Sequence, residues 1–161
     1  MHQVSSQDIV ITSLKMRPEY VNILAKWAFD TWGEYNPSAS FEKTKQKFQE
    51  HLNEERLPLT YVALKKDRPI GMCSLRENDG IRTDLTPWLG SLFVEPEYRH
   101  HSIARRLIES IKQKAIEMHY GKLYLLTFDS TLPQWYERLG WKPISSEWLN
   151  NFPVTIMEIE L

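Results

Sequence analysis

"VEPEYRHHSIARRLIESI", from Val94 to Ile111, combines a helical pattern with an unexpected charge pattern. Ile103, Leu107 and later apolar residues recur every three or four positions, which predicts an amphipathic helix. The first part of the stretch, residues 99–106, holds three arginines and two histidines and no acidic residue. A helix N-terminus carries a partial positive charge and favours acidic side chains, so this clustering of cations needs an explanation.

Two explanations of this basic turn are open. The free backbone N–H groups of a helix start can bind a phosphate-like anion, and Arg99 with Arg105 or Arg106 would flank it. Ser102 and Ala104 are small enough to let such a ligand approach the backbone. The alternative is an exposed turn whose charges are solvated, at a cost of about a few tenths of a kcal/mol each.

Length and composition favour an ordinary globular protein. With 161 residues, 42% hydrophobic and 25% charged, the chain is expected to form one domain over residues 1–161. The net charge of -1 argues against a general nucleic-acid binder. The single cysteine, Cys73, cannot form an internal disulfide and fits a reducing cytoplasm. We find no signal peptide or membrane-spanning run, so we expect a cytoplasmic protein that does not bind membranes.

Strand and helix patterns alternate along the rest of the chain. Strands are predicted at residues 8–15, in two segments joined at 66–68, and at 88–94, 122–128 and 154–161. Helices are predicted from Pro18 to about Gly33, after Ser40 as a cap, after the basic turn, and over 133–141, closed by Gly140. This order indicates an α/β fold with a mixed sheet.

The same order, with two motifs in it, resembles the GNAT superfamily of acyl-CoA-dependent N-acetyltransferases. The family signature is Arg or Gln, two variable residues, Gly, one residue, then Gly or Ala. Arg99, Ser102 and Ala104 occupy these positions, with serine in place of the middle glycine. The second marker, an aromatic–Tyr pair followed by a basic residue, Gly and an aromatic, matches "WYERLGW", Trp135 to Trp141.

The resemblance covers essentially the whole chain and is closest to small bacterial single-domain members. It implies an α/β fold with a mixed, mostly antiparallel central sheet of six to seven strands flanked by helices. It also implies acetyl-CoA as the acyl-donor cosubstrate. The implied CoA-binding residues are Leu92, Phe93 and Val94, through their backbone, and Arg99, His100, His101, Ser102, Ile103 and Ala104 of the signature loop.

Two more residues take their expected roles from the resemblance. Tyr136 is the tyrosine of the second marker, which in the family lies near the CoA sulfur and often acts as the general acid. Asp129 stands seven residues before it, where many members carry Asn beside the pantetheine channel.

The chemistry of acyl transfer to an amine suggests further candidates. The amine must lose a proton, which a carboxylate can accept directly or through water. Asp84, Glu34 and Glu77 are candidates, although solvated surface carboxylates are the more common case. A phenol with a pKa of about 10 can protonate a leaving thiolate, which agrees with the role implied for Tyr136. A backbone N–H of the 88–94 strand would stabilise the oxyanion.

For the other conspicuous residues, we expect the following surroundings and roles. Trp32, Glu34 and Tyr35 are candidates for an acceptor pocket, as the equivalent region is in many family members, although aromatic residues on a helix more often belong to the core. Four of the five histidines, His51, His100, His101 and His119, make no metal-ligand pattern, so we expect no metal and histidines at the surface or beside phosphate. Cys73 is expected to be an inert buried thiol.

The predicted function is therefore direct acetyl transfer from acetyl-CoA to a primary amine of a small molecule, peptide or protein, by a monomer or homodimer. Two alternatives stay open. One is a CoA-binding module with impaired catalysis, and the other is a protein-interaction domain with a basic helix start.

Overall fold

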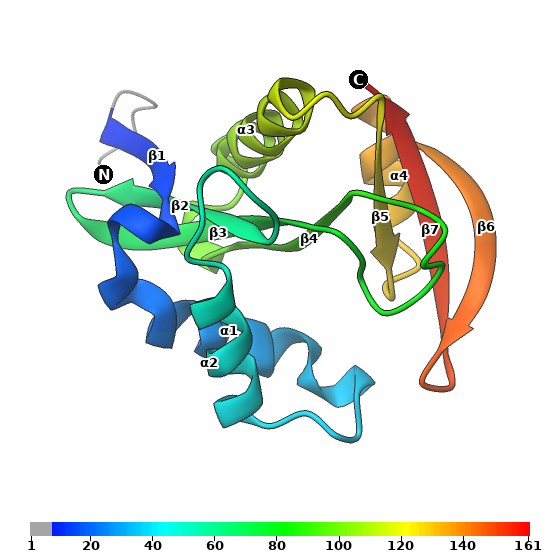
Figure 1. The fold of residues 1–161 in the computed structure, drawn as a ribbon, viewed down its shortest axis with the longest axis horizontal. Helices are drawn as coiled ribbons and strands as arrows, with labels where there is room; N and C mark the ends of the chain where they lie inside the picture. Colours follow the sequence, from blue (N-terminus) through cyan, green and yellow to red (C-terminus); the bar gives the residue numbers. More distant parts are fainter. Residues whose placement is uncertain (1–7) are drawn as a thin grey trace.

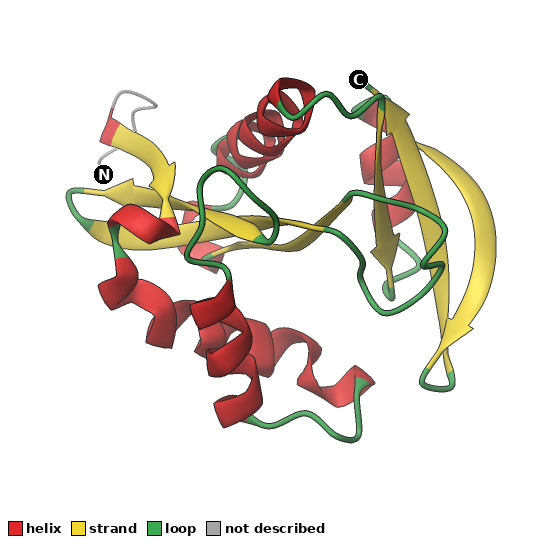
Figure 2. Cartoon of the chain, in the orientation of Figure 1, coloured by secondary structure: helices red, strands yellow, loops and turns green. Residues whose placement is uncertain are grey.

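The computed structural model describes residues 8–161 and contains one open sheet with helices on both faces (Figures 1 and 2). The strands are β1 (Ile9–Ser13), β2 (Leu59–Lys65), β3 (Arg68–Arg76), β4 (Trp88–Val94), β5 (Lys122–Thr127), β6 (Lys142–Leu149) and β7 (Phe152–Glu160). The α-helices are α1 (Val21–Trp32), α2 (Phe41–Glu50), α3 (Ile103–Glu117) and α4 (Leu132–Arg138). The prediction of a mixed sheet flanked by helices is confirmed.

The sheet has seven strands in the order β1-β2-β3-β4-β5-β7-β6. All neighbours are antiparallel except β4 and β5, which are parallel. This parallel pair forms only at its beginning, where Trp88 pairs with Tyr124. Within residues 8–161 no other residue of β4 pairs with β5, so the sheet divides into two halves at this point (Figure 1).

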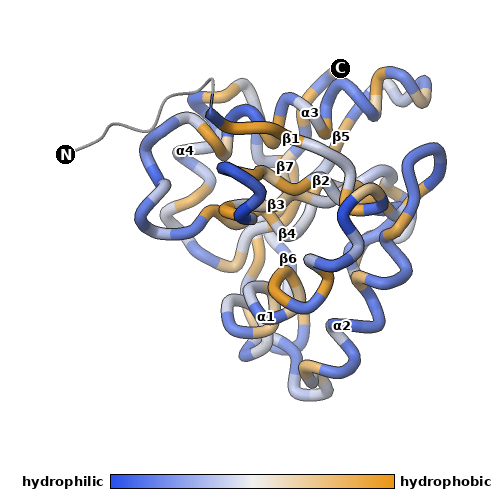
Figure 3. Tube along the Cα trace, turned by 90° about the vertical axis from the view of Figure 1, so that its left-hand side faces the viewer, coloured by the Kyte–Doolittle hydropathy of each residue, from blue (hydrophilic) through white to orange (hydrophobic). Residues whose placement is uncertain are grey.

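The helices cover the sheet according to their apolar residues. Helix α3 buries five side chains on one face: Ile103, Leu107, Ile108, Ile111 and Ala115. Helices α1 and α2 cover the opposite face and form a second cluster with the strand residues Val62, Leu64 and Met72. Because β2 and β3 are covered on both faces, they are buried almost throughout, and the trace of these central strands in Figure 3 includes many hydrophobic segments.

Most predicted elements form where the sequence places them. Strand β4 and the start of α3 agree with prediction, and Ser40 caps α2 by accepting a hydrogen bond from the Lys43 N–H at 3.1 Å. Strand β6 was not predicted because it is an edge strand with no buried residue, so it shows no apolar alternation. In the described part of the chain, no helix is both long and apolar enough to cross a membrane.

Candidate functional site

A cleft of about 1500 Å³ opens where β4 and β5 separate. Of the residues singled out from the sequence, the cleft is lined by Trp32, Tyr35, His51, Glu77, Leu92, Phe93, Val94, Arg99, His100, Ser102, Ile103, Ala104, Arg105, Asp129 and Tyr136. His101, Glu34 and Asp84 are not among its lining residues. The fold therefore brings together segments that are far apart in the sequence.

Strand β4 is irregular where it borders the cleft. Its register with β3 shifts between Met72 and Ser74, so Ser91 and Leu92 both lie opposite Cys73. Such a two-against-one arrangement is a β-bulge, which redirects backbone groups and leaves one residue out of the ladder. Ser91 has a φ of 51°, in the left-handed region that only glycine adopts without strain. Backbone amides of this strand can thus face the cleft instead of a neighbouring strand.

The basic turn lines the cleft. Ser102 is the N-cap of α3 with φ 64° and ψ 13°, and its side chain makes no capping hydrogen bond. His100 is also left-handed, with φ 68°. The first N–H groups of α3 have no acceptor within the helix, and its first turn holds no acidic residue. This backbone shape and charge suit an anion such as a diphosphate.

Arg99 connects this turn to β4. Its Nε donates to the Val94 carbonyl at 2.8 Å, and its guanidinium carbon lies 5.6 Å from the centre of the Phe93 ring. The Phe93 ring in turn stacks on Trp27 of α1, with centroids 5.0 Å apart. The last residues of β4 are therefore fixed from two sides.

Ser102 allows a direct test of the left-handed turn. Ser102→Gly should raise the free energy of unfolding by about 1 kcal/mol, because it removes the Cβ that disfavours a positive φ. Ser102→Ala keeps the Cβ and loses only a hydroxyl that caps nothing, so it should leave stability unchanged. Urea unfolding of both variants measures this. Equal stability of the glycine and alanine variants would show that Ser102 is not strained.

Tyr136 lies on α4 and is 6% exposed at the wall of the cleft. Its ring makes edge contacts with Trp135 and Trp141 at centroid distances of 4.9 and 6.0 Å. Burial, and then the nearby Cys73 thiol, raises the pKa of Tyr136 above its usual range. The phenol therefore remains protonated through the neutral range and can act as a proton donor.

The predicted carboxylates lie in different surroundings. Asp129 lines the cleft, and the Thr131 backbone N–H and hydroxyl donate to it at 2.8 and 2.7 Å, which lowers its pKa. Asp84 is exposed and accepts hydrogen bonds from Arg82, which lowers its pKa. Glu77 is the one predicted base candidate among the residues that line the cleft.

Stacked aromatic rings also line the cleft. Tyr35, in the short 3-10 turn Gly33–Tyr35 after α1, stacks on Phe128 with a centroid distance of 3.9 Å. Asn150, between β6 and β7, donates to the Tyr35 carbonyl at 3.2 Å. Phe152 packs edge-on against Tyr35. These contacts join the first helix to the C-terminal half of the sheet, next to the predicted pocket residue Trp32.

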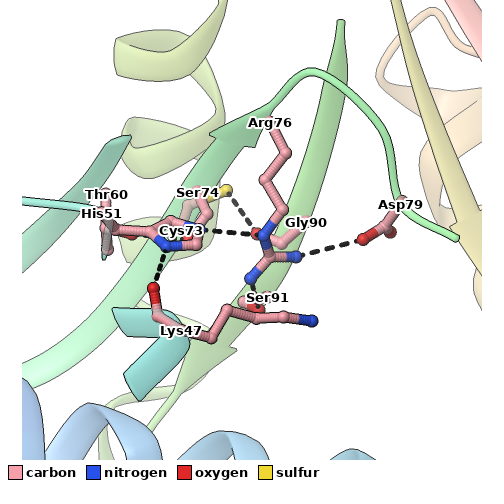
Figure 4. A network of polar contacts seen from close by, with 9 residues as sticks. All are labelled: Lys47, His51, Thr60, Cys73, Ser74, Arg76, Asp79, Gly90 and Ser91. Atoms are coloured by element: carbon pink, nitrogen blue, oxygen red, sulfur yellow. Dashed lines mark hydrogen bonds and ion pairs between the residues drawn. The ribbon is translucent and has the colours of Figure 1, made fainter. Parts of the chain in front are cut away.

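A polar network under β4 was not predicted from the sequence (Figure 4). Arg76 donates to His51, Asp79 and Ser91 at 3.0, 3.2 and 2.6 Å. The expectation that His51 is a surface histidine is wrong, because it is 2% exposed. Its Nδ1 lies 2.6 Å from the Lys47 carbonyl, so Nδ1 carries the proton and Nε2 accepts from Arg76. Gly90, a glycine inside a strand, was the signal for an irregularity here.

Comparison with known proteins identifies the fold. Residues 21–141 match the model of the Acetyltransferase (GNAT) family. An aminoglycoside 6'-N-acetyltransferase complexed with coenzyme A is 20% identical, with a TM-score of 0.72 over 94% of this chain and 96% of that one. An acetyltransferase from Streptococcus agalactiae is also 20% identical, with a TM-score of 0.72 over 96% and 99% of the two chains.

A chain of the NatC complex bound to Gag peptide and CoA is 25% identical, with a TM-score of 0.68 over 96% of this chain and 99% of that one. No curated protein matches the sequence. The family model covers most of the chain, and these solved structures share its fold over 94 to 96% of the chain. This protein therefore belongs to the GNAT acetyltransferase family.

Proposed function

We propose that this protein is an N-acetyltransferase that moves the acetyl group of acetyl-CoA directly to a primary amine in a ternary complex. One observation supports this proposal most directly. A single cleft is lined by the basic turn before α3, by the bulged part of β4 and by the Tyr136 phenol. The acceptor is a small molecule or a peptide or protein amine, since the structurally similar proteins include an aminoglycoside N-acetyltransferase and a complex with a bound peptide.

The residues around the turn fit the donor substrate. The N–H groups of the loop from His100 to Ala104 would hold the diphosphate of CoA, with His101 and Ile103 contributing backbone groups and Arg99 supplying charge. The backbone of Leu92 to Val94 would pair with the pantetheine amides, because this edge of β4 is not paired with β5. Asp129 lines the same cleft.

The proposed reaction needs one proton donor and one proton acceptor. The neutral amine nitrogen attacks the thioester carbonyl carbon, the C–N bond forms, and the C–S bond breaks. Tyr136 donates its proton to the leaving sulfur, and the proton lost by the amine passes to water or to Glu77, after which the phenol is reprotonated. Backbone N–H groups of β4 would stabilise the oxyanion, an effect worth about 3 kcal/mol for one well-placed donor.

The acceptor would bind beside the aromatic residues of the cleft. Trp32 and Tyr35 line that part of the cleft, and Glu34 lies between them in the sequence, where it could attract a cationic acceptor at the entrance. Asp84 is left without a role in this scheme, because it pairs with Arg82 and is not among the residues that line the cleft. A cytoplasmic location as a monomer or homodimer completes the proposal, since the one cysteine is a buried free thiol.

Two measurements test this function. Titration of CoA by calorimetry should give saturable binding, and acetyl-CoA with a panel of amines should release free thiol in proportion to acetylated amine detected by mass. Binding without acceptor-dependent thiol release would favour a CoA-binding module that has lost catalysis. The absence of CoA binding would leave only the interaction-domain alternative.

A further inference from the structure

The Arg76 guanidinium lies against the bulge of β4, and each of its three nitrogens has a partner (Figure 4). Nη2 donates to the Ser91 hydroxyl at 2.6 Å, the shortest of these contacts. The Arg76 side chain is 11% exposed, and its partner Asp79 is 21% exposed. A largely buried guanidinium with three directed contacts holds its partners in fixed positions, because moving any one leaves a buried donor unsatisfied.

Gly90 makes room for this guanidinium. A Cβ at Gly90 would collide with Nη1 of Arg76, so any other residue would displace the arginine. Cys73, opposite the bulge, places its Sγ 3.7 Å from the Gly90 carbonyl. The backbone of β4 at this point is therefore in direct contact with the arginine head group.

The far side of the guanidinium is also fixed. Nε donates to His51 Nε2 at 3.0 Å, which requires a neutral imidazole, and Asp79 accepts from Nη1 at 3.2 Å. These two partners come from the end of α2 and from the segment after β3. The arginine thereby ties the bulge to two elements that are independent of β4.

The bulge needs such support. Ser91 is left-handed, and this conformation costs about 1 kcal/mol or more for a residue with a Cβ. We propose that Arg76 is a positioning residue that holds the β4 bulge in the shape required to present backbone N–H groups to the acetyl carbonyl. This inference rests on the proposed function and assigns a task to a residue outside the motifs of the sequence.

The main test is Arg76→Gln, with Arg17→Gln as a matched control. Arg17 also makes a guanidinium network, donating to Glu19 and Asp67 at 3.0 and 3.1 Å, but it does not line the cleft. In Arg76→Gln we expect kcat to fall about 100-fold while KM for acetyl-CoA changes little. The control should retain the wild-type kcat. An unchanged kcat in folded Arg76→Gln, or an equal fall in both variants, would overturn the proposal.

Two less disruptive substitutions test the same contact and can be used if Arg76→Gln folds poorly. Ser91→Ala removes only the hydroxyl, and Gly90→Ala pushes the guanidinium away without removing it. Each should lower kcat about tenfold at unchanged CoA affinity. Adding Gly90→Ala to Arg76→Gln should cause little further loss, because the group it displaces is already gone. Wild-type kcat in both single variants contradicts the proposal.

A measurement without any substrate separates this inference from the proposed function. Amide hydrogen exchange of residues 90–93, followed by NMR, should be at least about tenfold faster in Arg76→Gln than in wild type or Arg17→Gln. Unchanged exchange would show that Arg76 does not hold the bulge, whatever the protein catalyses. If the wild-type protein binds CoA but acetylates no amine, the proposed function is refuted. The role of the bulge in presenting N–H groups to the acetyl carbonyl is then refuted as well.

Discussion

Tyr136→Phe should lower kcat by about 100-fold while leaving CoA affinity nearly unchanged, because it removes a general acid and no packing. The ring would keep its contacts with Trp135 and Trp141. Steady-state kinetics with the best acceptor, together with CoA titration, measures both quantities. Since the pKa of Tyr136 is raised, the phenol should not limit the rate at alkaline pH. At pH values below the pKa of the acceptor amine, activity should rise with pH, because a larger fraction of the amine becomes neutral.

Tyr124→Phe is the matched control for this experiment. Tyr124 is another buried tyrosine, 9% exposed, on β5 but outside the cleft lining. It should retain the wild-type kcat. If Tyr136→Phe also retains it, the thiolate is protonated by another group, and Tyr136 is a wall of the cleft only.

Acid should weaken the fold through His51 well before carboxylates titrate. Burial, and then the Arg76 charge, lowers the pKa of His51 to about 3 in the folded protein, whereas an unfolded histidine has a pKa of about 6.5. Between these values the unfolded chain binds the proton and the folded one does not. The contribution of His51 to the free energy of unfolding is therefore complete above about pH 6.5 and is lost as the pH falls toward 3. Between pH 7.5 and 5 the free energy of unfolding should fall by about 2 kcal/mol.

His51→Gln isolates this effect. Glutamine can still donate to the Lys47 carbonyl or accept from Arg76 but does not titrate, so its stability should be lower at pH 7.5 and nearly flat down to pH 5. His119→Gln, at an exposed histidine, should keep the wild-type slope. Urea unfolding at several pH values gives the slopes. A wild-type slope in His51→Gln would mean that another group carries the acid sensitivity.

The site was only partly readable from the sequence. The basic turn and the tyrosine of "WYERLGW" were visible because each is a local pattern, and the structure places both on the cleft. Asp84 is predicted as a carboxylate near the cleft, but it pairs with Arg82 and is not among the lining residues. The sequence predicts His51 to lie at the surface or beside phosphate, because nothing in "QEHLNEE" indicates that its ring is buried against an arginine from β3.

The sequence by itself determined the order of the elements apart from the edge strand β6, the strand at 88–94, the amphipathic helix that follows, and the family of the fold. Those features follow from local periodicity and turn chemistry, which act between residues close in the chain. Only the tertiary structure decided where β4 leaves β5, that Ser91 forms a bulge, and that Arg76 supports it. These depend on contacts between residues 15 or more positions apart, which no local pattern encodes.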